Sequence, residues 1–191
     1  MPTYFIHLCV AKKVNPNATL DFFIGSLAPD SVSGKEKDIN HFRNESNMEL
    51  ALKKFAQTIN TENEYLKGFL LHLFVDWKWN DSVLTDFAKR EGDGWYKKYY
   101  VEGTLIESYG CHNTEWAYKL REQINACNNF NYVETEFVTE EGIKTMFKNS
   151  HSWEIENKTE PSTAFPPEFI EKFASDTADD FIKWFSGLEL I

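Results

Sequence analysis

The chain has 191 residues, of which 42% are hydrophobic and 16% aromatic, and it carries a formal net charge of −10. This length and composition indicate one globular domain with enough apolar side chains to build a core. The large negative charge repels polyanions, so we expect neither a nucleic-acid scaffold nor an anionic membrane as a partner. Nothing in the sequence predicts the oligomeric state.

The cysteines and the first residues indicate the compartment. Cys9, Cys111 and Cys127 are scattered and odd in number, which predicts neither a disulfide framework nor a thiolate zinc site. Residues 1–14 lack the basic start of a signal peptide. No apolar run reaches the length of about eighteen uncharged residues that a transmembrane helix needs. The sequence therefore predicts a cytoplasmic protein without a transmembrane segment.

Helical periodicity dominates the chain from beginning to end. The expected helices cover residues 4–14, 19–27, 48–59, 61–80, 81–90, 94–109, 113–128 and 166–185. Thr19 is the expected N-cap of the second helix, and Thr61 with Glu64 forms the capping-box pattern of the fourth. Residues 31–46 are expected to form a loop, and 131–141 are ambiguous, with a short strand pair as one alternative. The fold class predicted for residues 1–191 is a single all-α domain.

Two ionisable residues interrupt the most apolar helix, in the stretch GFLLHLFVDWKW from Gly68 to Trp79. His72 and Asp76 are four residues apart and therefore share one face of the helix. Apolar residues surround them on every side, so we expect this helix to be central and buried. A buried carboxylate costs several kcal/mol unless it is paired or bound to a metal. Taken alone, the pair predicts a His–Asp hydrogen bond inside the core.

Three further ionisable residues occupy apolar or rigid positions in the first half of the chain. His7 lies within an apolar helix, Asp30 ends the turn GSLAPD, and His41 precedes Phe42 in a polar segment. Each alone has an ordinary explanation, as a core histidine, a turn former or a surface histidine. Together with the HxxxD pair they supply three imidazoles and two carboxylates, which suit zinc or a similar divalent metal. The set also suffices for two ions that share a bridging carboxylate.

The motifs FIGSLAPD, HF and YLKGFLLHLFVD resemble the zinc-dependent phospholipase C family, over roughly residues 1–85. Bacterial phosphatidylcholine-cleaving phospholipases C and S1/P1-type nucleases are related to that family in fold and metal chemistry. The family pattern is an early His, an Asp in a G-x-[LI]-A-P-D turn, a His followed by Phe, and HxxxD on a central helix. It is matched in order by His7, Asp30, His41, His72 and Asp76. The resemblance implies a multi-helix bundle of the phospholipase C/P1 nuclease type.

The resemblance also implies roles for the matching residues. His41, His72, Asp76 and Asp30 would hold one zinc ion, and Asp76 would bridge to a second ion that His7 also binds. Asp30 would in addition orient or deprotonate the attacking water. The implied activity is zinc-dependent hydrolysis of phosphate esters, of the phosphodiesterase or phospholipase C kind, on a small phosphoester or phospholipid. The implied cofactor is one or two Zn²⁺ ions, or another divalent metal.

Later ligands of that family have no match here. His112 and His151 each precede a Glu by three residues, but neither has the family spacing, and we expect capping or surface roles for both. This departure favours one or two ions over three and keeps an alternative function open. The alternative is a non-catalytic helical module whose metal only stabilises the core.

Several other positions have two interpretations. The aromatic residues in GWYKKYY, residues 94–100, are expected to pack in the core; the alternative is an aromatic wall for a lipid headgroup or base, with Lys97 and Lys98 near a phosphate. Asn80 and Asp81 are expected to cap the helix rather than to support the metal ligands. Gly68, one turn before His72, is the expected point of close contact with a neighbouring helix.

Overall fold

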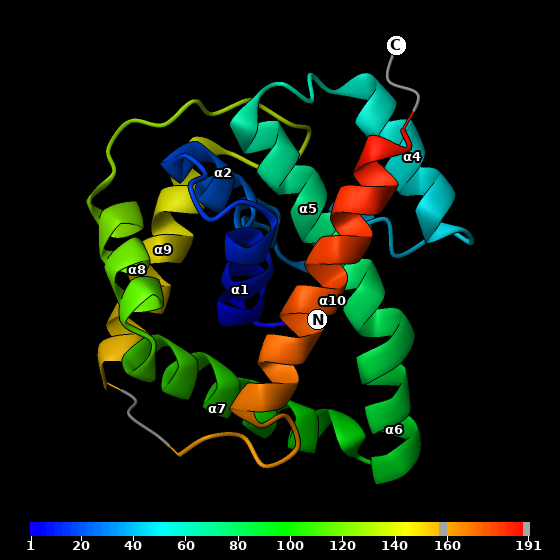
Figure 1. The fold of residues 1–191 in the computed structure, drawn as a ribbon, viewed down its shortest axis with the longest axis vertical. Coiled ribbons are helices and arrows are strands. Elements are labelled where there is room, and N and C mark those ends of the chain that lie inside the picture. Colours follow the sequence, from blue (N-terminus) through cyan, green and yellow to red (C-terminus); the bar gives the residue numbers. More distant parts are fainter. Residues whose placement is uncertain (157–159, 189–191) are drawn as a thin grey trace.

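The computed structural model describes residues 1–156 and 160–188, with the backbone alone over 151–156 (Figure 1). Every regular element in these ranges is helical, which confirms the all-α class. The α-helices are α1 Tyr4–Val14, α2 Leu20–Gly25, α3 Gly34–Asn40, α4 Met48–Thr58, α5 Glu64–Lys78, α6 Thr85–Glu91, α7 Trp95–Asn113, α8 Glu115–Ala126, α9 Glu140–Glu156 and α10 Pro167–Ser186. A 3-10 turn, Ala28–Ser31, precedes α3, and a π-helical turn, Trp79–Leu84, follows α5.

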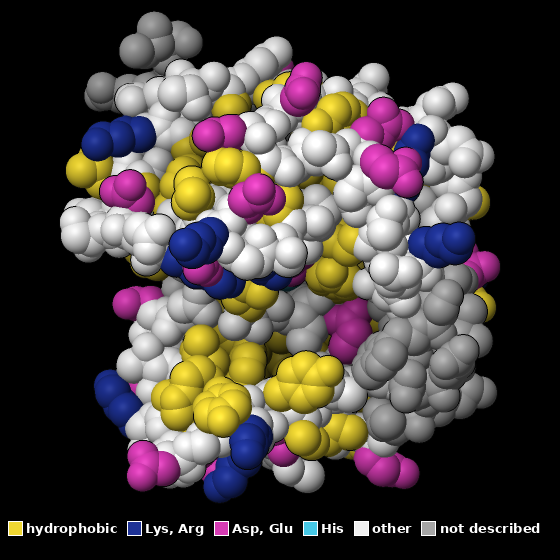
Figure 2. Space-filling model, turned by 180° about the vertical axis from the view of Figure 1, so that it is seen from behind, with side chains coloured by type: hydrophobic (Ala, Val, Ile, Leu, Met, Phe, Trp, Pro, Cys, Tyr) yellow, Lys and Arg dark blue, Asp and Glu magenta, His cyan; other side chains and the backbone are white. Residues whose placement is uncertain are grey.

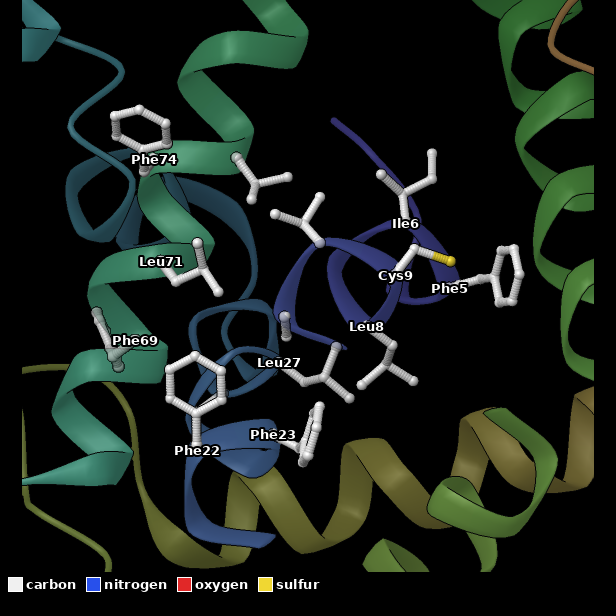
Figure 3. Close-up of a cluster of buried hydrophobic side chains, with 14 of the residues drawn as sticks. Phe5, Ile6, Leu8, Cys9, Phe22, Phe23, Leu27, Phe69, Leu71 and Phe74 are labelled. Carbon is white, nitrogen blue, oxygen red and sulfur yellow. The ribbon is translucent and has the colours of Figure 1, made fainter. Parts of the chain in front are cut away.

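Helix α5 lies at the centre of the hydrophobic core, as its sequence predicts. Almost every residue from Tyr65 to Asp76 is buried, and α1, α2, α4 and α10 contact this helix. Figure 3 shows side chains of α1, α2 and α5 meeting, among them Leu8, Phe22 and Leu71. Burying each such side chain contributes about 1.5–3 kcal/mol. The core therefore fixes the relative positions of the helices that carry His7, Asp30 and the HxxxD pair.

Two glycines allow α2 and α5 to pack with their backbones in close contact. A Cβ atom on Gly68 would lie 2.1 Å from the carbonyl oxygen of Phe22, and one on Gly25 would lie 2.0 Å from that of Tyr65. Neither distance leaves room for a methyl group, because the atoms in the way belong to backbone. The expected close contact at Gly68 is confirmed, and it brings the end of α2 against the helix turn that bears His72.

The helix boundaries follow the local capping chemistry. Helix α1 coincides with the predicted residues 4–14, and the Thr19 side chain caps α2 by accepting a hydrogen bond from the Phe22 amide. The predicted cap of α5 is wrong, because the side chain of Asn63, not Thr61, accepts from the Leu66 amide. Asn63 directly precedes the first helical residue, whereas Thr61 lies too early in the chain to reach the first turn.

Two segments differ from their predictions. Residues 31–46 are not entirely loop, because they contain α3, a helix that buries no side chain and so lacks an amphipathic pattern. Within the described ranges, residues 131–141 contain no strand pair. This segment is held instead by side chains, with Asn131 bonded to Asp21 and the Tyr132 hydroxyl donating to the Val138 carbonyl. Those contacts take the place of a β-ladder.

Helix α10 packs its apolar face against α1 and α5, and in Figure 1 it passes in front of the lower part of α5 and beside α1. Thr177 and Phe181 are buried, while Phe169 near the start of the helix is 37% exposed. This face is therefore core along most of its length but not at its first turn. None of the described helices combines the length and the apolar character needed to cross a membrane.

Candidate metal centre

All five predicted ligands lie together in the core. His7 comes from the middle of α1, Asp30 from the 3-10 turn after α2, and His41 from the C-terminal end of α3. His72 and Asp76 project from α5. Their side chains are at most 5% exposed. We call this cluster of His7, Asp30, His41, His72 and Asp76 the cage.

The cage atoms lie at distances typical of ligands that share an ion. The His7 Nε2 atom is 3.4 Å from Asp76 Oδ1, and His41 Nε2 is 3.3 Å from Asp30 Oδ1. The His7 and His72 rings stack, with their centroids 3.9 Å apart and their planes at 7°. Two overlapping triads each have ligand atoms within 4.8 Å of one another, namely His7–Asp30–His72 and His41–His72–Asp76.

Backbone carbonyls fix the orientation of two imidazoles. His72 Nδ1 donates to the Ser26 carbonyl and His41 Nδ1 donates to the Lys37 carbonyl, each over 2.9 Å. Since a carbonyl only accepts, both Nδ1 atoms carry the hydrogen and both Nε2 atoms present a lone pair. These Nε2 atoms face each other at 3.2 Å, where two lone pairs repel. Two nitrogen ligands on one tetrahedral zinc ion lie about 3.3 Å apart, which this pair fits.

Several buried polar atoms of the cage lack a hydrogen-bond partner among the described residues. They are both ring nitrogens of His7 and both carboxylate oxygens of Asp76; Oδ1 of Asp30 also receives no well-directed hydrogen bond, although the Lys37 ammonium lies 2.8 Å away. Orphaned atoms of this kind are rare in protein interiors and require a partner such as an ion. The donor set of imidazole nitrogens and carboxylate oxygens therefore fits a divalent cation.

The pKa values of the cage residues match that interpretation. Burial acts to raise the pKa of Asp30 and of Asp76. The net shift of each pKa is nevertheless downward, because of the charge of His72 for Asp30 and because of the close approach of His7 for Asp76. Burial, followed by the neighbouring His7, lowers the pKa of His72 to about 3. At neutral pH the cage thus holds carboxylates together with a neutral His72 imidazole, the protonation states that metal binding requires.

Acid should destabilise the metal-free protein through His72. Its pKa is about 3 when folded and about 6.5 when unfolded, so below pH 6.5 the unfolded chain binds the proton first. The stabilising contribution is complete above pH 6.5 and is lost as the pH falls towards 3. We expect the free energy of unfolding to drop by about 3 kcal/mol between pH 7 and pH 4 through this residue alone. The lowered pKa values of Asp30 and Asp76 act in the same direction at lower pH.

Urea unfolding of chelator-treated protein at pH 7, 5.5 and 4 measures this effect. The matched variant is His72→Gln, which removes the titrating ring and should give a flatter pH dependence. Equal pH dependence of the two proteins would contradict the assignment of a depressed pKa to His72.

The residue directly after His41 has a left-handed backbone conformation. Phe42 has φ of 53°, an uncommon conformation for a bulky side chain, and its ring packs edge-on against Phe55. Strain of this type persists only where the surrounding structure enforces it. The turn at Phe42 directly follows α3 and helps to hold His41 in its place within the cage.

A cleft opens beside the cage at the N-terminal end of α1. It has a volume of about 550 Å³ and is lined by residues that include Met1, Tyr96, Tyr100 and Glu107. Figure 2 shows a hollow across this face, with hydrophobic side chains gathered along its lower edge and Lys and Arg side chains along its upper edge. Burial lowers the pKa of the Met1 amino group, and the opposing charges of Asp76 and Asp30 act on it. Met1 thus lines the cleft, and its amino group is influenced by the charges of these two carboxylates of the cage.

The aromatic residues of segment 94–100 divide between core and cleft. Trp95 and Tyr99 pack against the core, and the Tyr99 hydroxyl donates to the Met1 carbonyl while accepting from the Trp79 indole. Tyr96 and Tyr100 are 59% and 76% exposed and line the cleft. The prediction of core packing holds for the first pair only. Lys98 pairs with Glu91, and the alternative that Lys97 and Lys98 lie near a phosphate stays a prediction.

The predictions for the remaining residues have mixed outcomes. His112 belongs to neither triad, and its Nδ1 donates to the Ser108 carbonyl. The side chain of His151 lies outside the described residues. Asn80, within the π-helical turn after α5, has a buried Oδ1 without a partner among the described residues. Sequence reasoning missed Lys37, whose Nζ lies 2.8 Å from Asp30 Oδ1; a lysine in a polar segment carries no signal of that contact.

The geometry establishes an all-α protein in which two overlapping, buried groups of His and Asp side chains could hold a metal ion. The phospholipase C/P1 nuclease fold and the identity of the ion remain predictions from the sequence motifs. Comparison of the chain with family models, with curated proteins and with solved structures found no match.

Proposed function

We propose that this protein is a zinc-dependent hydrolase of phosphate esters, with a phosphodiesterase or phospholipase C-like activity. The observation that carries the proposal is the cage itself, in which three imidazoles and two carboxylates converge and His7 and Asp76 have no hydrogen-bond partner among the described residues. A divalent ion bound there would act as a Lewis acid and would lower the pKa of water near it. The motifs shared with the zinc-dependent phospholipase C family support the same chemistry.

The cage residues have separate roles in this proposal. His41 and His72 bind through Nε2, with orientations fixed by the Lys37 and Ser26 carbonyls. Asp76 has two free oxygens, which suits it to contact one ion or to bridge two. The pKa of Asp30 is held well below its usual range despite burial. Asp30 is therefore better suited to bind an ion and orient water than to store a proton at neutral pH.

The adjoining cleft is the proposed route for the substrate. Its volume of about 550 Å³ matches a small ligand, and the amino group of Met1, which lines it, is influenced by the charges of Asp76 and Asp30. The exposed rings of Tyr96 and Tyr100 offer an apolar surface on one side. A small phosphoester or the headgroup end of a phospholipid fits these features.

The proposal predicts that zinc-loaded protein cleaves a chromogenic phosphodiester or phosphomonoester and that Asp30→Asn reduces kcat at least about 100-fold. The variant keeps the shape of the side chain but removes its charge. Asp81→Asn is the matched control, since Asp81 is exposed and lies outside the cage, and its kcat should equal that of the wild type. Steady-state rates and the zinc content of each protein are measured together. Equal rates for Asp30→Asn and wild type would contradict the role given to Asp30.

A structural metal is the second candidate function, and the burial of the cage favours it. His7, His41 and His72 are at most 1% exposed, as in closed sites that stabilise a fold. Bound zinc that raises the melting temperature, with no turnover of diester, monoester or phospholipid, would establish this function and reject the enzyme. Failure to bind any divalent metal would reject both.

A further inference from the structure

Lys37 is the cation that stands at the edge of the cage. Its Nζ lies 2.8 Å from Asp30 Oδ1, and its side chain is 19% exposed, against 5% for Asp30 and 1% for His41. The backbone carbonyl of the same residue orients His41. One residue thus borders the cage through both its main chain and its ammonium group.

The ammonium group is close to Asp30 without being locked there. Although the ion pair is short, Asp30 Oδ1 receives no well-directed hydrogen bond from the described residues. Lys37 also belongs to α3, which buries no side chain. A lysine on a flexible stem with three rotatable donors can turn from one oxygen to another at small cost.

Helix α3, which carries Lys37, is linked to the cleft through Arg43. The Arg43 guanidinium contacts both Asp38 of α3 and the Met1 side chain, and Met1 lines the cleft. The chain as a whole carries a net charge of −10, which repels an approaching anion. A local positive charge between cleft and cage is what an anionic group needs in order to enter.

We propose that Lys37 binds the phosphoryl group of the substrate, donating a charge-assisted hydrogen bond to one of its oxygens. This inference rests on the proposed function, because the phosphoryl group must also reach the ion in the cage. Among the described residues, no His, Asp or Glu cluster other than the two triads could hold a metal ion. Lys37 thus supplies the additional positive charge beside Asp30.

Calorimetric titration of zinc-loaded protein with inorganic phosphate tests the inference without relying on turnover. We expect Lys37→Met, which keeps the stem and removes the charge, to weaken phosphate binding about tenfold or more. Lys35→Met changes the net charge equally at an exposed position of the same helix and should bind phosphate as the wild type does. Lys37→Arg should retain most of the affinity. Zinc content and the melting temperature are measured for every variant.

Each outcome decides a separate point. Wild-type phosphate affinity in zinc-loaded Lys37→Met would overturn the inference. Loss of zinc from Lys37→Met would also overturn it, because Lys37 would then position Asp30 rather than bind phosphate. Wild-type protein that holds zinc but no phosphate would reject the role of Lys37 and leave the metal site intact. Wild-type protein that holds no zinc would reject the proposed function itself.

Discussion

Replacing His72 with alanine is expected to abolish metal binding, the largest functional effect of any single substitution in this chain. His72 is the one residue shared by both triads, so its loss leaves each with two ligands. Zinc at 100 times its dissociation constant should stabilise the wild type by about 2.7 kcal/mol and leave His72→Ala unchanged. Thermal unfolding with and without added zinc, together with metal analysis of the dialysed protein, measures this difference.

The matched control is His112→Ala. His112 is partly buried and, like His72, donates through Nδ1 to a backbone carbonyl, but it lies in neither triad. Its zinc content should equal that of the wild type. Because an alanine at position 72 leaves a cavity, Asp76→Asn serves as a second test that conserves volume. Full zinc retention by both His72→Ala and Asp76→Asn would exclude the cage as the metal site.

Gly68→Ala is expected to produce the largest loss of stability. In most helices this change is favourable by about 1 kcal/mol, because alanine has the higher helix propensity. At Gly68 the added Cβ would lie 2.1 Å from the Phe22 carbonyl oxygen and 2.9 Å from the Ser26 amide nitrogen. Since α2 must move away from α5, we expect the free energy of unfolding to fall by about 2–4 kcal/mol. The shift should also disturb the bond between His72 and the Ser26 carbonyl and weaken zinc binding.

Gly103→Ala is expected to change the free energy of unfolding in the opposite direction. Gly103 lies inside α7, and an added Cβ would meet only the Thr3 methyl group at 3.6 Å, an ordinary contact. This substitution should raise the free energy of unfolding by about 0.5–1 kcal/mol. Urea unfolding of both variants at one pH gives the comparison. A stabilising Gly68→Ala would show that the two helices are not packed backbone to backbone.

The cage residues could be identified from sequence because burial and ionisation conflict at those positions. His7 and His72 interrupt runs that have no other reason to contain a polar group, and the glycine and proline near Asp30 restrict its backbone. The helix α5 was equally predictable, since its apolar residues extend around the whole circumference. Such a pattern is a polar residue among apolar neighbours, and a single sequence is enough to reveal it.

Other features could not be predicted because they depend on distant partners. Helix α3 has no apolar face, so nothing in residues 34–40 separates it from a loop. Lys37 meets Asp30 only after the chain has turned. Tyr96 and Tyr99 belong to the same helix and both line the cleft, yet Tyr96 is exposed while Tyr99 packs against the core. Which face of α7 is covered depends on Met1, almost a hundred residues away.

The contacts that hold α3 in place allow residues outside the cage to influence its affinity for a metal ion. This helix of seven residues is held to the 3-10 turn by polar contacts, with Asn40 donating to the Pro29 carbonyl and Lys37 pairing with Asp30. Ordering each residue costs about 1 kcal/mol, and no apolar burial within α3 offsets that cost. Any opening of α3 moves His41, so the stability of this helix contributes to the free energy of binding an ion through His41. Substitutions of exposed residues such as Glu36, which touch no ligand, can then tune metal affinity through helix propensity alone.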